Sequence, residues 1–159
     1  MRSRGLLPLI VVGLLVASCG GEESGSAAAA PFHAIPDDAV AVSGTAACVF
    51  GGGFEGLMVE CELDMSDPRV SGTEVHDGFT FFAEGSGGRV WVAEEASITN
   101  ADGTWGGSAQ GAEDYQFTPS GEAHYVGEGA YEGLEFHYYF FHADLSDKAE
   151  LRGWISGGG

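Results

Sequence analysis

Glycine-rich and Asn/Asp/Pro segments interrupt the chain every few residues from Val40 onward, and no convincing amphipathic helix lies between them. The intervening runs are rich in β-branched and aromatic residues. Apolar residues tend to take every second position in these runs, as in Leu57–Asp64. Such alternation is typical of a strand that buries one face. The sequence therefore predicts an all-β fold.

The predicted strands number about eight or nine, at the spacing of a sandwich or barrel. They come from ten short runs: Val40–Phe50, Leu57–Asp64, Val70–Glu74, Val75–Ala83, Arg89–Thr99, Thr104–Ala109, Tyr115–Thr118, Ala123–Tyr131, Leu134–Ala143 and Ala149–Ser156. Asp77-Gly78 leaves open whether the third and fourth runs form one strand. Closure removes exposed edges, and glycines inside strands permit the bends of a small barrel. We expect a single small antiparallel β-barrel of about eight strands, with a β-sandwich as the alternative.

The N-terminus has the architecture of a signal peptide: a short basic segment followed by an apolar run that ends at Ser18. Leu15–Cys19 resembles the lipobox of bacterial lipoproteins, in which the cysteine is lipidated and becomes residue one. Ordinary secretory cleavage, with Cys19 incidental, is the alternative. We expect residues 1–18 to form a lipoprotein signal peptide, 19–33 a lipidated Cys19 and flexible tether, and 34–159 the barrel domain.

A lipidated Cys19 predicts attachment to a membrane through acyl chains such as palmitate, with the domain facing outside the cytoplasm. Gly20 stands where the familiar inner-membrane retention signal of Gram-negative lipoproteins has Asp. The expected location is therefore the cell membrane or the outer membrane.

Acidic residues outnumber basic ones by 24 to 6, which gives a formal charge of −18. Arg2 and Arg4 belong to the predicted signal, so the mature chain is more acidic still. The basic residues that remain are Arg69, Arg89, Lys148 and Arg152. Because such a charge repels phosphate backbones, nucleic acid is excluded as a partner. With 44% hydrophobic residues, the chain is too apolar to be disordered.

Two cysteines remain once Cys19 is assigned to lipid. Cys48 and Cys61 lie in the two strands of the first predicted hairpin, at equal distances from its turn. In an exported protein this placement predicts a disulfide, with two buried free thiols as the alternative.

The sequence contains no nucleophile elbow, phosphate loop or paired Cys and His, so neither catalytic residues nor a cofactor are assigned. Its histidines lack the close spacing of metal ligands, and no metal is expected. His124 and His137 could still meet across a hairpin that turns at residues 128–133. Among the carboxylates, Glu94 lies among the apolar residues of its strand, where burial would raise its pKa.

The run from Leu134 to His142 is aromatic on both faces. Phe136, Tyr138, Phe140 and His142 share one face, and together with Glu94 they are the predicted ligand-binding residues. The other face carries His137, Tyr139 and Phe141. A barrel strand needs only one apolar face, so this second row lines a ligand surface, meets a partner, or is covered by the tail around Trp154.

The segment from Gly127 to Gly133 resembles the Gly-x-Gly-x-aromatic-x-Gly hairpin of small β-barrels in the allene oxide cyclase and dirigent families. Met65–Thr73 is similar to a segment of secreted bacterial proteins of comparable size. The resemblance implies an eight-stranded barrel whose interior accepts a small apolar molecule. It assigns no catalytic residue to this chain.

Three functions follow from these patterns. The first is a lipid-anchored, non-enzymatic barrel that binds a small apolar or amphipathic ligand. The second is an envelope module that docks a protein or glycan through aromatics such as Tyr139 or Trp105. The third is a cyclase- or isomerase-like enzyme that uses a buried Glu or Tyr, with Glu94 as the candidate. The oligomeric state is left open.

Overall fold

The structure is a computed structural model that describes residues 35–51, 56–83, 89–113, 119–141 and 148–157. Its strands are β1 (Val40–Gly51), β2 (Met58–Met65), β3 (Gly72–Ala83), β4 (Arg89–Thr99), β5 (Thr104–Glu113), β6 (Pro119–Glu128), β7 (Leu134–Phe141) and β8 (Lys148–Gly157). Two short 3₁₀ turns, η1 (Pro68–Val70) and η2 (Gly129–Tyr131), complete the elements. Among these described residues, no helix is long and apolar enough to cross a membrane.

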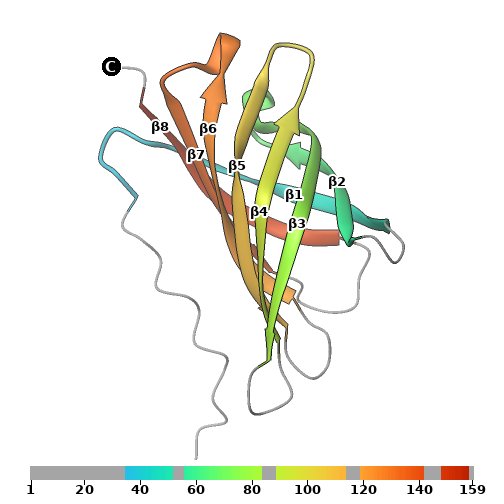
Figure 1. Cartoon of the computed structure of the whole chain (residues 1–159). Coiled ribbons are helices and arrows are strands. Elements are labelled where there is room, and N and C mark those ends of the chain that lie inside the picture. The colour runs from blue at the N-terminus through green and yellow to red at the C-terminus, as the bar shows by residue number, and fades with distance from the viewer. Residues whose placement is uncertain (1–34, 52–55, 84–88, 114–118, 142–147, 158–159) are drawn as a thin grey trace, which may run out of the picture. The chain divides into compact units, whose positions relative to one another are not determined.

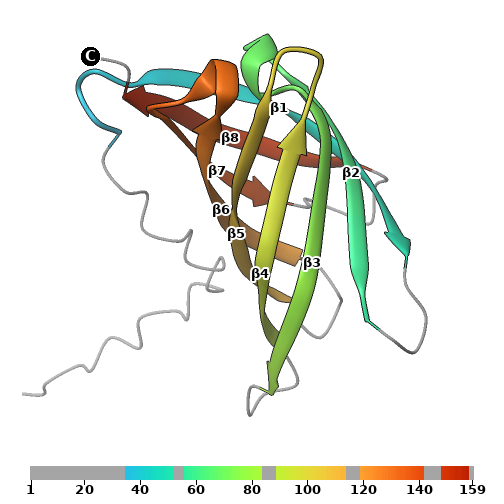
Figure 2. The ribbon, with the colours of Figure 1, turned by 45° about the horizontal axis from the view of Figure 1, so that its top comes forward.

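The strands form a closed barrel (Figures 1 and 2). Each strand pairs antiparallel with the next along the chain, and β8 returns to pair antiparallel with β1. The predicted eight-stranded barrel is therefore confirmed over the sandwich. Closure gives all eight strands two hydrogen-bonded neighbours, which removes the exposed edges that an open sheet of this composition would present.

The predicted strand bounds are corrected at several places. Residues 72–83 form one strand, and Val70 belongs to η1 instead. Strand β5 extends to Glu113, whereas β6 begins at Pro119 and gives way to η2 after Glu128. The predicted strand at 115–118 lies outside the described residues, as do the signal, Cys19 and the tether.

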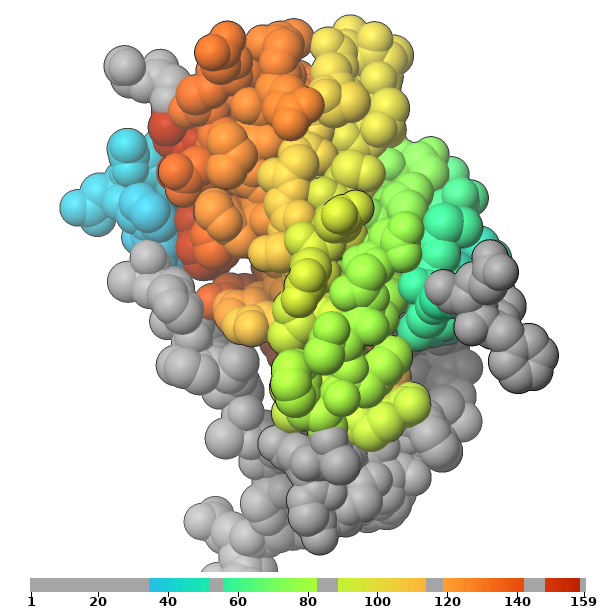
Figure 3. All heavy atoms as spheres, viewed as in Figure 1, coloured from blue at the N-terminus to red at the C-terminus, as the bar shows by residue number. Residues whose placement is uncertain are grey.

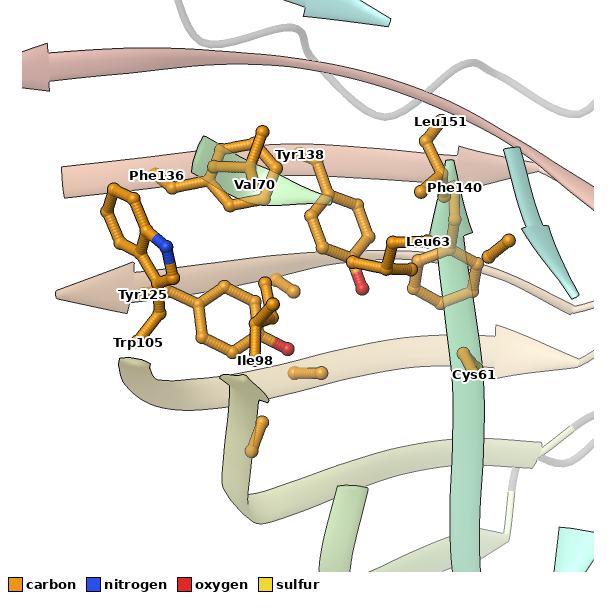
Figure 4. Packing of buried hydrophobic residues seen from close by; sticks show 14 of the residues in the cluster. Cys61, Leu63, Val70, Ile98, Trp105, Tyr125, Phe136, Tyr138, Phe140 and Leu151 are labelled. Atoms are coloured by element: carbon orange, nitrogen blue, oxygen red, sulfur yellow. The ribbon is translucent and has the colours of Figure 1, made fainter. Parts of the chain in front are cut away.

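Aromatic rings occupy much of the barrel interior, where the close-up of the core shows Trp105, Tyr125, Phe136, Tyr138 and Phe140 (Figure 4). Gly111 of β5 and Gly121 of β6 lie opposite each other in register. A Cβ atom at Gly121 would lie 2.6 Å from Cζ of Phe140, and one at Gly111 would lie 2.7 Å from Cζ2 of Trp91. The two glycines thus make room for Trp91 and Phe140, whose rings stack at 5.8 Å.

An irregularity in β3 and β4 changes which residues face the interior. Gly78 has a φ of 66°, and the β4–β5 register shifts between Ala93 and Ala96. On β4, Ala96 and Ala93 are both buried although they differ by an odd number, so the alternation reverses between them. A β-bulge has this effect because it adds one unpaired residue to a strand.

Two sequence-based assignments on β4 are wrong for this reason. Strict alternation puts Trp91 on the outer face of β4, away from Val92 and Ala96. In the structure Trp91 is 6% exposed and packs with the core rings. Glu94 is exposed at the bulge, instead of lying among apolar residues. The strand was located correctly, but its inner face was not.

One end of the barrel is capped by hydrogen-bonded side chains around Asn100, in the β4–β5 turn. Asn100 Nδ2 donates to the carbonyls of Arg69 and Ser71, both at 3.0 Å, and Tyr131 Oη donates to Asn100 Oδ1 at 2.8 Å. Trp105 Nε1 also donates to the Arg69 carbonyl, at 2.8 Å. We call this the capped end. Residues 100–103 form the hairpin turn between β4 and β5.

The predicted disulfide is present. Cys48 of β1 and Cys61 of β2 pair directly in register, and their Sγ atoms are bonded at 2.04 Å. Cys61 is 3% exposed and belongs to the core cluster, so the bridge also contributes to the packing of the interior.

Candidate functional site

The barrel interior contains an acidic residue that the sequence analysis did not single out. Glu74 of β3 is 1% exposed, and His76, two positions along the same inner face, is 6% exposed. They are the only buried polar or charged residues in the described part of the chain. Burying a carboxylate without partners is very unfavourable, so its contacts determine what this pair can do.

Three side chains surround one oxygen of Glu74. Tyr125 Oη of β6 donates to Glu74 Oε1 at 2.5 Å, and Tyr138 Oη of β7 donates to the same oxygen. His76 Nε2 lies 3.2 Å from Glu74 Oε1 and 3.2 Å from Tyr125 Oη. Figure 4 shows the two tyrosines, with hydroxyls that point away from Trp105. We call Glu74, His76, Tyr125 and Tyr138 the interior polar cluster.

The cluster holds Glu74 in its ionised form. Burial acts to raise the pKa of Glu74, but the charge and hydrogen bond of His76 and the two tyrosine hydroxyls outweigh it and hold the pKa below its ordinary value of 4.5. Burial, followed by the Glu74 charge, raises the pKa of Tyr125 and Tyr138 well above the ordinary range. Both phenols therefore remain protonated donors beside a carboxylate at neutral pH.

Aromatic rings continue from the cluster to the end of the barrel opposite the capped end. His76 lies 6.3 Å from Phe79 and 6.5 Å from Trp91, measured between ring centroids. Phe79 packs on Trp91 at 5.5 Å and stacks on Phe81 at 5.9 Å. Phe81 is 40% exposed, so this row of rings leads from the buried cluster to the surface.

At this second end β1, β3, β5 and β7 finish and β2, β4, β6 and β8 begin, and we call it the loop end. Arg89 Nη2 pairs with Glu113 Oε2 at 2.5 Å, and the guanidinium lies 5.0 Å from the Phe81 ring centroid. In the space-filling view, β3 and β4 run side by side toward this end (Figure 3). The exposed large apolar residues on β1, β2 and β3 near this end are Val49, Phe50, Met58, Phe81 and Phe82.

The predicted ligand-binding residues of β7 do face the interior. Phe136, Tyr138 and Phe140 are 0%, 2% and 8% exposed, and all three belong to the core cluster. His142 lies outside the described residues. Glu94, the fifth predicted residue, is exposed on β4 and does not join them.

The second aromatic face of β7 lies on the outside of the barrel. Tyr139 is 2% exposed, and its ring lies 6.1 Å from that of Trp154 on β8. Of the three alternatives for this row, packing against Trp154 is the one that the described residues show. Trp105 is 0% exposed at the capped end. The two aromatics named for a docking surface, Tyr139 and Trp105, are therefore both buried.

His124 and His137 meet across the β6–β7 hairpin, as expected. They pair in register, and their rings stack at 4.1 Å. Both line a hollow of about 190 Å³ on the outer face, and His124 Nε2 lies 3.5 Å from Glu135 Oε2. Within the described residues, no three His, Cys, Asp or Glu side chains are arranged to hold a metal ion.

The interior polar cluster can act chemically in two ways. An ionised carboxylate among aromatic walls can pair with a donor or cationic group of a bound molecule. It can also accept a proton from such a molecule, because the phenols and His76 are positioned to redistribute it. Both roles place Glu74, and not Glu94, at the reacting or binding position.

Comparisons with protein families, with curated proteins and with solved structures found no match. The likeness to the allene oxide cyclase and dirigent families stays a prediction.

Proposed function

We propose that this protein is a membrane-anchored barrel that binds a small apolar or amphipathic ligand in its interior, on the outer side of a membrane. The observation that carries the proposal is the interior polar cluster at the inner end of an aromatic row that reaches the surface at Phe81. Binding sites of this class combine mostly apolar walls with a few fixed polar groups.

The unfavourable free energy of burying these polar groups also supports a ligand-binding role. A barrel of this size could fill its middle layer with apolar side chains, and replacement of buried ionic groups by apolar ones is often neutral or stabilising. Perturbed ionisable groups inside a protein are candidates for functional sites. The apolar residues exposed at the loop end support a path for the ligand at that end.

A neutral fluorescent probe tests the proposal without favouring any charge. The mature chain with Cys19→Ser, which carries no acyl chain of its own, is titrated with N-phenyl-1-naphthylamine. We expect saturable fluorescence enhancement, which Phe81→Ala weakens severalfold. Native mass spectrometry of protein released from membranes should show a bound small molecule. A barrel that takes up no probe and carries no small molecule would overturn the proposal.

Val126→Ala is the matched control for Phe81→Ala. Val126 is 48% exposed, close to the 40% of Phe81, but it lies on the outer face of β6 near the capped end. Both variants remove exposed apolar surface. Only Phe81→Ala is expected to lower the affinity for the fluorescent probe. Equal effects of the two variants would indicate nonspecific adsorption.

Membrane attachment has a separate test. We expect the wild-type chain to fractionate with membranes and to incorporate labelled palmitate. The Cys19→Ser chain, exported with a standard secretory signal peptide, should appear in the soluble fraction without label. A labelled Cys19→Ser chain would contradict lipidation at this residue.

Proton transfer to or from the bound molecule is the second candidate function. The ionised state of Glu74 is the observation behind it, since an unprotonated carboxylate is able to accept a proton from a bound molecule. Once mass spectrometry has identified the bound molecule, incubation in D₂O distinguishes the two functions. Deuterium that enters a carbon position with wild type, but not with Glu74→Gln, would indicate an isomerase or cyclase.

A further inference from the structure

We propose that the ligand of the barrel is a cationic amphiphile, whose protonated amine pairs with Glu74 while its apolar chain lies along Phe79, Trp91 and Phe81 toward the loop end. This inference rests on the proposed function and names its ligand class. Fatty acids and other anionic amphiphiles are excluded by it.

The first argument is the charge inside the barrel. Glu74 accepts hydrogen bonds from two neutral phenols, and His76 is the single nitrogen base among the buried residues described. Neither phenol carries a positive charge, so full neutralisation of the carboxylate depends on His76 alone. A ligand ammonium within hydrogen-bond distance of Glu74 would supply a permanent positive charge where a low dielectric strengthens the attraction.

The second argument is that described guanidinium groups are already paired. Arg69 is bound to Asp67 at 2.7 Å near the capped end, and Arg152 lies 3.8 Å from Glu150 on the outer face. Arg89, at the loop end, pairs with Glu113 at 2.5 Å. An anionic headgroup that used one of these guanidinium groups would have to displace its carboxylate, in a chain with a formal charge of −18.

The third argument is the chemistry of the walls. The faces of aromatic rings attract cations, and the attraction is larger where water is excluded. Phe79 and Trp91 lie within 6.5 Å of His76 between ring centroids, Phe140 stacks on Trp91, and the rings of Tyr125 and Tyr138 stack at 6.2 Å beside Glu74. A negatively charged protein also raises the local concentration of cations near its surface, which favours encounter.

Three probes of equal chain length test the inference: decylamine, decanol and decanoate, titrated calorimetrically at pH 7 into the mature Cys19→Ser chain. We expect decylamine to bind at least about tenfold more tightly than either of the others, because a hydrogen bond to a charged group is worth about that much. Glu74→Gln should remove the preference for the amine over decanol.

Two controls separate the interior site from attraction to the acidic surface. Glu94→Gln removes the same charge from an exposed position and should leave the amine preference intact. In 0.5 M NaCl, surface attraction is screened, whereas a buried pair is not, so the preference should persist. This measurement uses the wild-type barrel and therefore decides the question even if Glu74→Gln does not fold.

The outcomes distinguish the two proposals. Equal or tighter binding of decanol or decanoate would overturn the cationic ligand and retain the ligand-binding barrel. An amine preference that vanishes in salt, or survives Glu74→Gln, would also overturn it. Failure of all three probes and of the neutral fluorescent probe would overturn the proposed function itself.

Discussion

Tyr125 Oη donates a 2.5 Å hydrogen bond to Glu74 Oε1 across the barrel, from β6 to β3. The two residues are 51 positions apart in the sequence, and only closure of the barrel brings them together. The bond links the stability of the fold to the ionisation of the proposed ligand-binding carboxylate, because the phenol favours the charged form.

This link predicts a pH dependence of stability. The pKa of Glu74 is lowered on folding, so its ionised form stabilises the protein above the ordinary carboxyl value of 4.5. That contribution is lost as the pH falls through the lower value in the folded state. Wild type and Glu74→Gln should therefore be compared by urea unfolding from pH 7 to pH 3. The difference between their free energies of unfolding should shrink at acid pH.

Glu94→Gln is the control for this series, because the chain has 24 acidic residues and the effect of Glu74 must be separated from the general loss of one negative charge. Glu94 is exposed, so its replacement should change the free energy of unfolding by no more than about 0.5 kcal/mol at any pH. An equal pH dependence for both variants would contradict a special role for the buried carboxylate.

The strand order, the disulfide and the inner face of β7 could all be predicted from the sequence, because alternation and turn chemistry are local signals. Glu74 could not, since it stood at the boundary between two predicted runs and the β-prone residues beside it, Thr73 and Val75, lie on the other face of β3. The one available signal was Glu74-Val75-His76, which places two ionisable groups on one strand face. The bulge between Ala93 and Ala96 on β4 reverses the alternation, which places Trp91 inward and Glu94 outward.

The capped end depends on the amide of Asn100. Asn100→Asp keeps an oxygen for Tyr131 Oη but replaces the donor to the Arg69 and Ser71 carbonyls with a second acceptor. We expect a loss of about 2–3 kcal/mol in the free energy of unfolding, because carbonyls lose a donor and face a carboxylate. Urea denaturation at pH 7 measures it. Asn100→Ser, which creates no charge, should lower the free energy of unfolding by less than Asn100→Asp does. A larger loss for Asn100→Ser would contradict the role given to the amide.

The Cys48–Cys61 disulfide should contribute about 3 kcal/mol to stability, since it closes a loop of 13 residues in separation. Urea unfolding with and without reductant measures the contribution. Peptide mapping under nonreducing conditions should recover the two cysteines in one linked fragment. Two free thiols at these positions, titrated in denaturant without reductant, would contradict the bridge.

The Gly111–Gly121 pair makes the most local prediction about packing. A methyl group at Gly121 would lie 2.1 Å from the Gln110 carbonyl oxygen and 2.6 Å from Phe140 Cζ, so both the β5–β6 ladder and the Trp91–Phe140 stack must move. We expect Gly121→Ala to cost about 2–3 kcal/mol and to weaken the near-ultraviolet circular dichroism of the aromatic core.

Gly106→Ala is the matched control on the neighbouring strand. Its Cβ atom would meet only the flexible end of Glu128, at 3.2 Å from Oε1, so the side chain can move aside. The free energy of unfolding should change by no more than about 0.5 kcal/mol, since no backbone atom or core ring obstructs the methyl group. If both variants were equally stable in urea, the space beside Phe140 would not be the reason for a glycine at 121.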